Sequence, residues 1–404
     1  MLKNQFRTGL ALMAASFFFY SCTQDQGTEE ETLFTNIAAP EVANSIEGQY
    51  IVVYNPGAVE DVAPKYPNDY SKAQEAMATQ TMKILSNASI SNAEIVNVYS
   101  RTLKGSTLKL TKAQVEVLKG QKEVAYIEQD RIVTFAPPAG DGNVEASSTQ
   151  ETPYGILRVN GITSYTGSGV AWIVDTGIDL DHPDLNVDAT RGFNAFTKGR
   201  DANSTDDGNG HGSHVAGTIA AINNSIGVIG VAPGAVVIPV KVLDSRGSGS
   251  YSGVIAGVDH VGANGKAGDV ANLSLGGPVS QALDDAVVAA SNQGIWFALA
   301  AGNSSEDANL SSPARANGPY IVTISAMDIN DTWAYFSNFG NPPVDFAAPG
   351  IAIKSTWKDG GYNTISGTSM AAPHAAGVLL LGAASTDGTV INDPDNNPDP
   401  IIAH

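Results

Sequence analysis

The stretch Val170-Ala171-Trp172-Ile173-Val174-Asp175-Thr176-Gly177 decides the fold expected for this chain, because five apolar residues run directly into a carboxylate. A short apolar run enriched in β-branched residues predicts a buried strand. In open α/β sheets, reactive and ligand-binding groups gather at the carboxyl ends of the strands. A buried Asp also needs a hydrogen-bond partner or a cation. On its own, however, Asp175 is more typical of a residue that caps a turn.

Similar apolar runs recur along the chain and alternate with segments of helical composition. Strands are predicted at residues 236–242, 270–275 and 295–300, and helices at residues 212–222, 252–262 and 281–292. Apolar strands separated by helices predict a mainly parallel central sheet covered by helices on both faces. We therefore expect an α/β domain over residues 152–384.

A small α+β domain is predicted before it, at residues 48–136. Tyr50-Ile51-Val52-Val53-Tyr54 is typical of a strand, Thr111 followed by Gln114 predicts a capped helix, and two more strands are predicted at 124–127 and 132–135. Residues 137–151 are rich in Pro, Gly and Ser, which predicts an exposed linker open to proteolysis. Residues 385–404 are acidic and Pro-rich, and predict a solvated tail without regular structure.

The first 22 residues are typical of an export signal. Lys3 and Arg7 precede an apolar run that is too short to span a bilayer, and Cys22 follows it. This pattern resembles a bacterial lipoprotein signal, in which the Cys is lipidated; the alternative is an ordinary signal with an incidental Cys. Residues 23–47 are predicted to form a linker. We expect an extracellular or cell-surface protein, exported from a bacterium and held at a membrane only through the lipid on Cys22.

Composition narrows the class of protein further. The 404 residues carry 22 Lys and Arg against 41 Asp and Glu, which gives a net charge of −19. Such a surface repels phosphate backbones, so nucleic acid is not an expected partner, and we expect a monomer. Because Cys22 is the only cysteine, no intramolecular disulfide and no Cys-based metal cluster can form. Stability is expected from packing, with structural Ca²⁺ as a further contribution.

A second reactive segment is Gly210-His211-Gly212-Ser213-His214, which places a His at the start of a predicted helix. His is the commonest general base near neutral pH, and flanking glycines allow another chain to approach closely. A metal site formed by His211 and His214 is the alternative. No Glu of a zinc-hydrolase pattern and no third ligand support it, so His214 is interpreted as structural.

A third segment, Gly367-Thr368-Ser369-Met370-Ala371, places a Ser at the start of an apolar helix that is expected to end near Ala384. Free backbone N–H groups and the positive end of the helix dipole favour an oxyanion there. The alternative is a plain N-cap Ser, the commonest use of Ser at this place.

Together these three segments, in the order Asp, His, Ser, resemble those of the subtilisin-like serine proteases, most closely the proteinase K-like branch. The order differs from that of chymotrypsin-like enzymes and of α/β-hydrolases. The resemblance implies that Ser369 attacks the scissile carbonyl, that His211 moves its proton, and that Asp175 orients His211. No cofactor is expected for this chemistry.

The segment Ala300-Ala301-Gly302-Asn303 resembles the oxyanion-hole segment of the same family. The side-chain amide of Asn303 and the backbone N–H of Ser369 are then expected to donate to the developing oxyanion. A turn residue after a Gly is the alternative for Asn303, and its place after an apolar strand disfavours that alternative.

Two further segments resemble the substrate-binding strands of the family. Gly247-Ser248-Gly249 is expected to pair with an extended peptide, the alternative being a flexible loop. Ser274-Leu275-Gly276 and Ala301-Gly302 are expected to form walls of the S1 pocket, and Tyr251 to border the S4 pocket. Small residues at these walls predict broad specificity with an apolar or aromatic P1 residue.

The resemblance implies two accessory features. Asp345 is expected to bind Ca²⁺ together with the backbone carbonyls of Pro319 and Ile321. Residues 48–136 resemble an inhibitor-type propeptide, with the best match at residues 126–130. Its last strand is expected to block the active site, and the domain to assist the folding of a slowly forming parallel sheet. Self-cleavage is expected between Pro137 and Glu151.

The sequence therefore predicts a secreted serine endopeptidase that hydrolyses proteins or peptides and is made as a self-processing zymogen. The competing hypothesis is a surface lipoprotein that binds peptides through an inactive protease fold. That hypothesis predicts the loss of at least one triad or oxyanion-hole group, and none is missing.

Overall fold

The computed structural model describes residues 44–134, 139–140, 145–146, 149–382 and 384–404. The predicted signal and Cys22 lie outside the described residues, as does most of the predicted processing linker. Within the described part of the chain, no helix is both long enough and apolar enough to cross a membrane.

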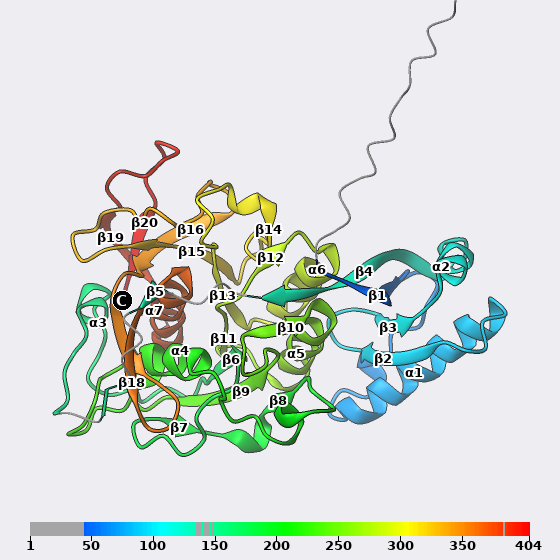
Figure 1. Cartoon of the computed structure of the whole chain (residues 1–404), viewed down its shortest axis with the longest axis horizontal. Helices are drawn as coiled ribbons and strands as arrows, with labels where there is room; N and C mark the ends of the chain where they lie inside the picture. Colours follow the sequence, from blue (N-terminus) through cyan, green and yellow to red (C-terminus); the bar gives the residue numbers. More distant parts are fainter. Residues whose placement is uncertain (1–43, 135–138, 141–144, 147–148, 383) are drawn as a thin grey trace, which may run out of the picture. The chain divides into compact units, whose positions relative to one another are not determined.

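A ten-stranded sheet lies at the centre of the larger domain (Figure 1). Its order is β19-β20-β16-β15-β13-β11-β6-β9-β7, with β8 also paired to β9. Every pair is parallel except β19 with β20. The strands are β6 (Ala171–Asp175), β7 (Asn186–Val187), β8 (Phe193–Asn194), β9 (Val236–Lys241), β11 (Val270–Leu273), β13 (Trp296–Ala300), β15 (Ile321–Met327), β16 (Val344–Pro349), β19 (Ser385–Thr389) and β20 (Pro400–Ala403). The predicted mainly parallel sheet is confirmed.

Strand β6 shows why helices cover both faces of this sheet. Ala171 and Ile173 pack in the core that holds α4 (His211–Ala220) and α7 (Thr368–Leu381). Trp172 and Val174 point to the opposite face, into the core that holds α5 (Tyr251–Asn264) and α6 (Gln281–Ser291). Burial of each Val or Ile side chain contributes about 1.5–3 kcal/mol, so an uninterrupted apolar run is stable only between two helical layers. One further short helix, α3 (Tyr154–Arg158), precedes β6.

The N-terminal domain is a four-stranded antiparallel sheet, to which β10 of the larger domain adds a fifth strand. Its elements are β1 (Ser45–Tyr54), α1 (Tyr70–Asn87), β2 (Glu94–Tyr99), β3 (Gly105–Lys109), α2 (Lys112–Lys119) and β4 (Val124–Thr134), and β10 is Ser248–Ser250. Thr111 and Gln114 form the predicted capping box of α2.

The prediction of two separate strands at 124–127 and 132–135 was wrong in one respect. Residues 124–134 form the single strand β4, and residues 124, 126–129 and 131 pair with β1. The polar residues Glu128 and Asp130 continue the strand because their carboxylates accept hydrogen bonds from Ala282 N (3.2 Å) and Ser252 N (3.1 Å) of the larger domain.

Several short strands and 3₁₀ helices complete the structure. The remaining strands are β5 (Ala139–Gly140), β12 (Gly277–Pro278), β14 (Ser311–Ser312), β17 (Ile353–Thr356) and β18 (Tyr362–Ser366), and the 3₁₀ helices are η1 (Ala63–Lys65), η2 (Ala189–Arg191), η3 (Arg200–Asn203) and η4 (Ala308–Leu310). Strand β18 pairs with β17 and leads directly into α7.

The expectation of a solvated C-terminal tail was also wrong. Strand β20 pairs in parallel with β16, and Ile401 and Ile402 are buried. The buried carboxylate of Asp399 accepts hydrogen bonds from Ser325 Oγ (2.5 Å) and Asn341 Nδ2 (2.8 Å). Pro400 does not prevent a strand because it is the first residue, where the missing N–H is tolerated.

Candidate active site

Asp175 and His211 meet at the carboxyl edge of the central sheet. Asp175 is the last residue of β6 and His211 is the first residue of α4. His211 Nδ1 lies 2.8 Å from Asp175 Oδ1 and 3.0 Å from Oδ2, and both side chains are fully buried. Because a carboxylate only accepts hydrogen bonds, this contact places the imidazole proton on Nδ1 and directs the lone pair of the neutral ring to Nε2.

Ser369 is the second residue of α7, whose N-cap is Gly367. Its Oγ donates to the backbone carbonyl of Ser274 at 3.2 Å, and Ser274 Oγ donates to Ser369 O at 2.8 Å. These two bonds fix Ser369 against the segment that follows β11. The free N–H groups of this helix end favour a negative charge next to the Ser369 hydroxyl.

Asn303 and the backbone of Ser369 present N–H groups to a common space. Asn303 Oδ1 accepts from Thr368 N (2.9 Å) and Thr368 Oγ1 (3.0 Å), which fixes the orientation of the amide. A Cβ placed on Gly367 would lie 3.6 Å from Asn303 Nδ2 and 3.7 Å from Ser369 N. Two N–H donors that face one small space can hold an oxyanion.

Asn303 and Ser369 also line a cavity of about 250 Å³. Its lining combines small and apolar residues: Thr134, Leu275, Gly276, Gly277, Ala300, Ala301, Gly302, Asn303, Ser304, Ser311, Ala314, Asn338, Thr368 and Ser369. The predicted wall residues Leu275, Gly276, Ala301 and Gly302 therefore lie together around Ser369 and Asn303. Ser274 contacts Ser369 from behind the cavity.

The segment predicted to pair with an extended peptide pairs with the inhibitor-like domain. In β10, Ser248 and Gly249 lie opposite Thr134 and Val133 of β4, in antiparallel register. A Cβ on Gly249 would lie 2.2 Å from Val242 O, so only Gly fits there. Gly247 immediately precedes this strand, in a left-handed conformation (φ +78°).

The side chain of Val133 occupies an apolar site beside Tyr251 and Leu275. Tyr251 is buried and donates its hydroxyl hydrogen to Pro278 O at 2.6 Å. A strand that pairs with β10 therefore places a side chain in this site, and in this structure that side chain is the aliphatic Val133.

His214 does not support the alternative of a metal site. Its Nε2 lies 2.9 Å from Ile353 O, and burial lowers its pKa to about 3, so the ring is neutral. His211 Nδ1 faces Asp175 instead of a shared ligand. In the described ranges there is no group of three or more His, Cys, Asp or Glu that could hold a metal ion.

The predicted calcium ligands lie near one another at the start of β15 and β16. Asp345 belongs to β16, Ile321 opens the neighbouring β15, and Pro319 lies two residues before it. Asp345 Oδ2 accepts from Thr323 N at 2.9 Å, and burial raises the pKa of Asp345 to about 6. One carboxylate and two carbonyl oxygens fit the ligand type that Ca²⁺ prefers but supply fewer than its usual six to eight oxygens, so water would have to provide the rest.

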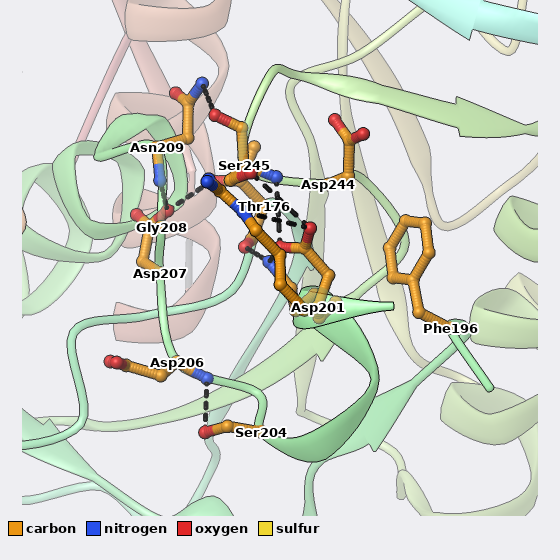
Figure 2. A network of polar contacts seen from close by, with 12 residues as sticks. Thr176, Phe196, Asp201, Ser204, Asp206, Asp207, Gly208, Asn209, Asp244 and Ser245 are labelled. Atoms are coloured by element: carbon orange, nitrogen blue, oxygen red, sulfur yellow. Dashed lines mark hydrogen bonds and ion pairs between the residues drawn. The ribbon is translucent and has the colours of Figure 1, made fainter. Parts of the chain in front are cut away.

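Sequence reasoning did not single out the polar network around Thr176 and Asp207 (Figure 2). Asp207 accepts from Thr176 Oγ1 at 2.9 Å, and Thr176 directly follows Asp175. The signal that was available is the short spacing between Asp207 and His211, which places the carboxylate one turn before the helix.

Comparison with known proteins assigns both domains to families. Residues 167–387 match the subtilase family, and residues 49–136 match the peptidase inhibitor I9 family. The chain is 37% identical over 392 residues to the extracellular serine proteinase of Thermus sp. (strain Rt41A), which covers 93% of this chain and 89% of that protein. It is 38% identical over 349 residues to alkaline serine exoprotease A of Vibrio alginolyticus, and it spans only 60% of that protein's length while 83% of this chain is covered. Among solved structures, a cold-adapted subtilisin-like serine proteinase matches with a TM-score of 0.53 and 37% identity, over 63% of this chain and 98% of that one.

Proposed function

The chain belongs to the subtilase family of serine proteases, and from this membership we propose that Asp175, His211 and Ser369 are its catalytic triad. The observation that carries the proposal is the cavity that Ser369 and Asn303 share, at the sheet edge where Asp175 holds His211. The I9 domain makes the chain a zymogen with its own inhibitor.

In the proposed reaction, Ser369 Oγ attacks the scissile carbonyl and His211 Nε2 takes the hydroxyl proton. Asp175 stabilises the imidazolium, while Asn303 Nδ2 and Ser369 N donate to the oxyanion. His211 then protonates the leaving amine, and the acyl-enzyme remains on Ser369. A water molecule, deprotonated by His211, hydrolyses the acyl-enzyme and restores the free hydroxyl.

The proposed specificity is broad, with an apolar or aromatic P1 residue in the cavity next to Ser369. The cavity lining of Ala300, Ala301, Gly302 and Ala314 supports this because it offers no charge to a side chain. Antiparallel pairing along β10 supports recognition of substrate backbone, and the cluster that Val133 shares with Tyr251 supports an apolar side chain in the pocket that Tyr251 borders.

Self-processing is proposed because β4 runs along β10 and its last residue, Thr134, reaches the cavity of Ser369. The cleavage point predicted between Pro137 and Glu151 stays a prediction.

We propose export from the cell, with the similarity to an extracellular proteinase in support. Lipidation of Cys22 and calcium at Asp345 are further proposals. Mass spectrometry of the mature protein tests the first: a diacylglyceryl mass on a peptide that begins at Cys22 supports it, and an N-terminus elsewhere rejects it. Chelation tests the second: EDTA should lower the unfolding temperature of the unaltered protein and leave that of Asp345→Asn unchanged.

The experiment that tests the main proposal compares the unaltered chain with Ser369→Ala. The unaltered chain should shorten itself and hydrolyse casein, and Ser369→Ala should do neither. If the unaltered chain stays at full length and leaves casein intact although it is folded, the enzyme hypothesis fails and the inactive peptide-binding protein becomes the better hypothesis.

A further inference from the structure

One buried carboxylate joins the two chain segments that carry Asp175 and His211. Asp207 is only 4% exposed and lies in the loop before α4 (Figure 2). Its oxygens accept five hydrogen bonds, from Thr176 Oγ1 (2.9 Å), Asn209 N (2.9 Å), Gly210 N (2.9 Å), Ser213 N (2.9 Å) and Ser213 Oγ (2.7 Å). Four of these donors come from residues directly around His211, and the fifth comes from the residue after Asp175.

Thr176 closes the connection between the two segments. Its hydroxyl donates to Asp207 and accepts from Gly212 N at 2.9 Å, so it touches the helix start on both sides of His211. His211 in turn contacts Asp175, which precedes Thr176 in the chain. The result is a closed ring of contacts. It runs from Asp175 to Thr176, from the Thr176 hydroxyl to Asp207, from Asp207 to the backbone N–H next to His211, and from the His211 ring back to Asp175.

Other contacts keep Thr176 from moving within this ring. Its backbone N donates to Asp175 Oδ1 at 2.7 Å, and its carbonyl accepts from the buried Lys241 Nζ at 2.5 Å. Lys241 also lies 3.4 Å from Asp201 Oδ1. Thr176 is therefore fixed through its N, its O and its hydroxyl, and only the hydroxyl bond leads to the segment of His211.

The chemistry of the ring requires an ionised carboxylate at residue 207. All five partners of Asp207 are donors, and a carboxylate has acceptor sites only. An Asn at this position would direct its NH₂ either toward Ser213 N or toward the three donors at the other oxygen. In the first orientation the backbone N–H of Ser213 would lose its acceptor inside the protein, and in the second those of Asn209 and Gly210 would, which costs more than the loss of an exposed hydrogen bond.

We propose that Asp207 is a positioning residue for catalysis, which holds the Asp175–His211 pair in register by joining Thr176 to the start of α4. It does not touch the substrate or the reacting atoms. The proposal rests on the proposed role of His211 as general base. If the imidazole is displaced by about 1 Å, the rate can fall by about 10²-fold.

The first test compares Asp207→Asn with Asp206→Asn in the mature enzyme. Asp206 is the matched control because it is exposed, carries the same charge and accepts only from Leu180 N at 3.3 Å. Active-site titration counts the folded enzyme in each sample. Asp207→Asn should lower kcat by about 10- to 100-fold with KM changed by less than about twofold, and Asp206→Asn should change neither by more than about twofold.

The pH profile of kcat/KM separates positioning from a loss of stability. The charged groups around the ring are Asp175, Lys241 and Asp201, together with Asp179, whose N donates to Ser213 Oγ at 2.9 Å, and Lys358, which donates to Gly208 O at 3.0 Å. Removal of the negative charge of Asp207 disfavours the imidazolium, so the acid limb should move to lower pH by about half a unit. An unchanged kcat and an unchanged acid limb per folded molecule would show that Asp207 serves stability alone, and would overturn the proposal.

A second pair of variants applies if Asp207→Asn does not fold. Thr176→Val keeps the shape but removes the hydroxyl that joins the two segments, and it should lower kcat by about tenfold. Thr176→Ser keeps the hydroxyl and should recover at least half of the activity that Thr176→Val loses. Equal loss in both variants would contradict the ring.

Proton NMR of full-length Ser369→Ala keeps the proposal testable even if the unaltered chain proves inactive. The Nδ1 proton of His211, held against Asp175, should give a low-field resonance that is absent in His211→Ala. Adding Asp207→Asn should shift or broaden this resonance, whereas adding Asp206→Asn should leave it in place. A resonance unchanged by Asp207→Asn would overturn the positioning role independently of any assay of hydrolysis.

Discussion

Asp207 and Asp259 are both buried carboxylates with five hydrogen-bond donors, but the origin of the donors differs. The donors to Asp207 all belong to the catalytic domain. The donors to Asp259, on α5, all belong to the inhibitor domain: Tyr70 Oη (2.8 Å), Ser100 N (3.0 Å), Arg101 N (2.8 Å), Thr102 N (2.7 Å) and Thr102 Oγ1 (2.9 Å). One carboxylate thus holds parts of its own domain together, and the other holds the two domains to each other.

This difference shows how one chemical device serves two purposes. A carboxylate that collects donors from its own domain loses them only when the domain unfolds. A carboxylate on a surface helix that collects donors from another domain can exchange them for water, so the contact is specific and yet reversible. Glu128 and Asp130 of the inhibitor domain do the same in the opposite direction, at the N-termini of α6 and α5.

The largest expected effect is on kcat, when the Asp175–His211 pair within the catalytic domain is changed. Asp175→Asn should lower kcat by about 10⁴-fold, because the amide favours the wrong tautomer of His211 and does not stabilise the imidazolium. Single-turnover hydrolysis of a chromogenic peptide measures it, with Asp206→Asn as control. A loss below about tenfold in folded protein would remove Asp175 from the triad.

The next effect concerns the donors that face Ser369. Asn303→Ala should lower kcat by about 10²–10³-fold, a size measured for the corresponding donor of a subtilisin, and should leave KM nearly unchanged. Asn317→Ala, which removes an exposed amide bonded only to Arg315 O, is the control. An increase in KM at constant kcat would indicate that Asn303 binds the substrate in its ground state instead.

Changes at the contact between Asp259 and the inhibitor domain should alter inhibition of the enzyme and leave kcat unchanged. Asp259→Asn should shorten the lag before activity appears in freshly processed zymogen by about 10-fold, because several donors of the inhibitor domain lose their partner. Asp285→Asn, which removes a single bond with Tyr126 Oη (2.6 Å), should shorten it by only a few-fold. Equal lags in the two variants, or a changed kcat in the mature enzyme, would contradict the comparison.

The smallest effect is the pH dependence of stability that two buried histidines of the catalytic domain cause. Burial lowers the pKa of His214 to about 3 and that of His374 to about 4, below the unfolded value of 6.5. The folded state therefore keeps both rings neutral, and the stability is present above pH 6.5 and is lost as the pH falls toward 4. The loss should be about 1.4 kcal/mol per pH unit for each ring.

Urea unfolding of Ser369→Ala at pH 7, 6 and 5 measures this dependence. His374→Gln should reduce the slope between pH 6 and 5 by about half. A free energy of unfolding that does not change over this range would show that the two rings are protonated in the folded protein.

Much of the fold could be predicted because its central strands are continuous apolar runs between helices. The run from Val170 to Val174 and the helix starts at His211 and Thr368 lie where the pattern predicts them. Strand β4 and the C-terminal strand β20 were not predicted correctly. The polar residues in or next to these strands form hydrogen bonds with residues that are far away in the sequence, and the sequence pattern does not reveal those bonds. Asp399, for example, is bonded to Ser325 and Asn341.

The candidate site could be located from motifs, but the residues that support it could not. Asp259 has ordinary sequence surroundings, and Asp207 is marked only by its short spacing to His211. The importance of both arises from donors that only the folded chain brings together. The acidic composition of the sequence indicates many carboxylates and does not distinguish those that are buried from those that are solvated.

Covalent labelling of the nucleophile tests the central claim most directly. A fluorophosphonate should add to the mature enzyme with one phosphonyl group per molecule, and peptide mass mapping should place it on Ser369. The same reagent should label His211→Ala at least about 10³-fold more slowly, because the hydroxyl then lacks its base. A folded, processed enzyme that takes up no label, or that carries it on another serine, would contradict the account.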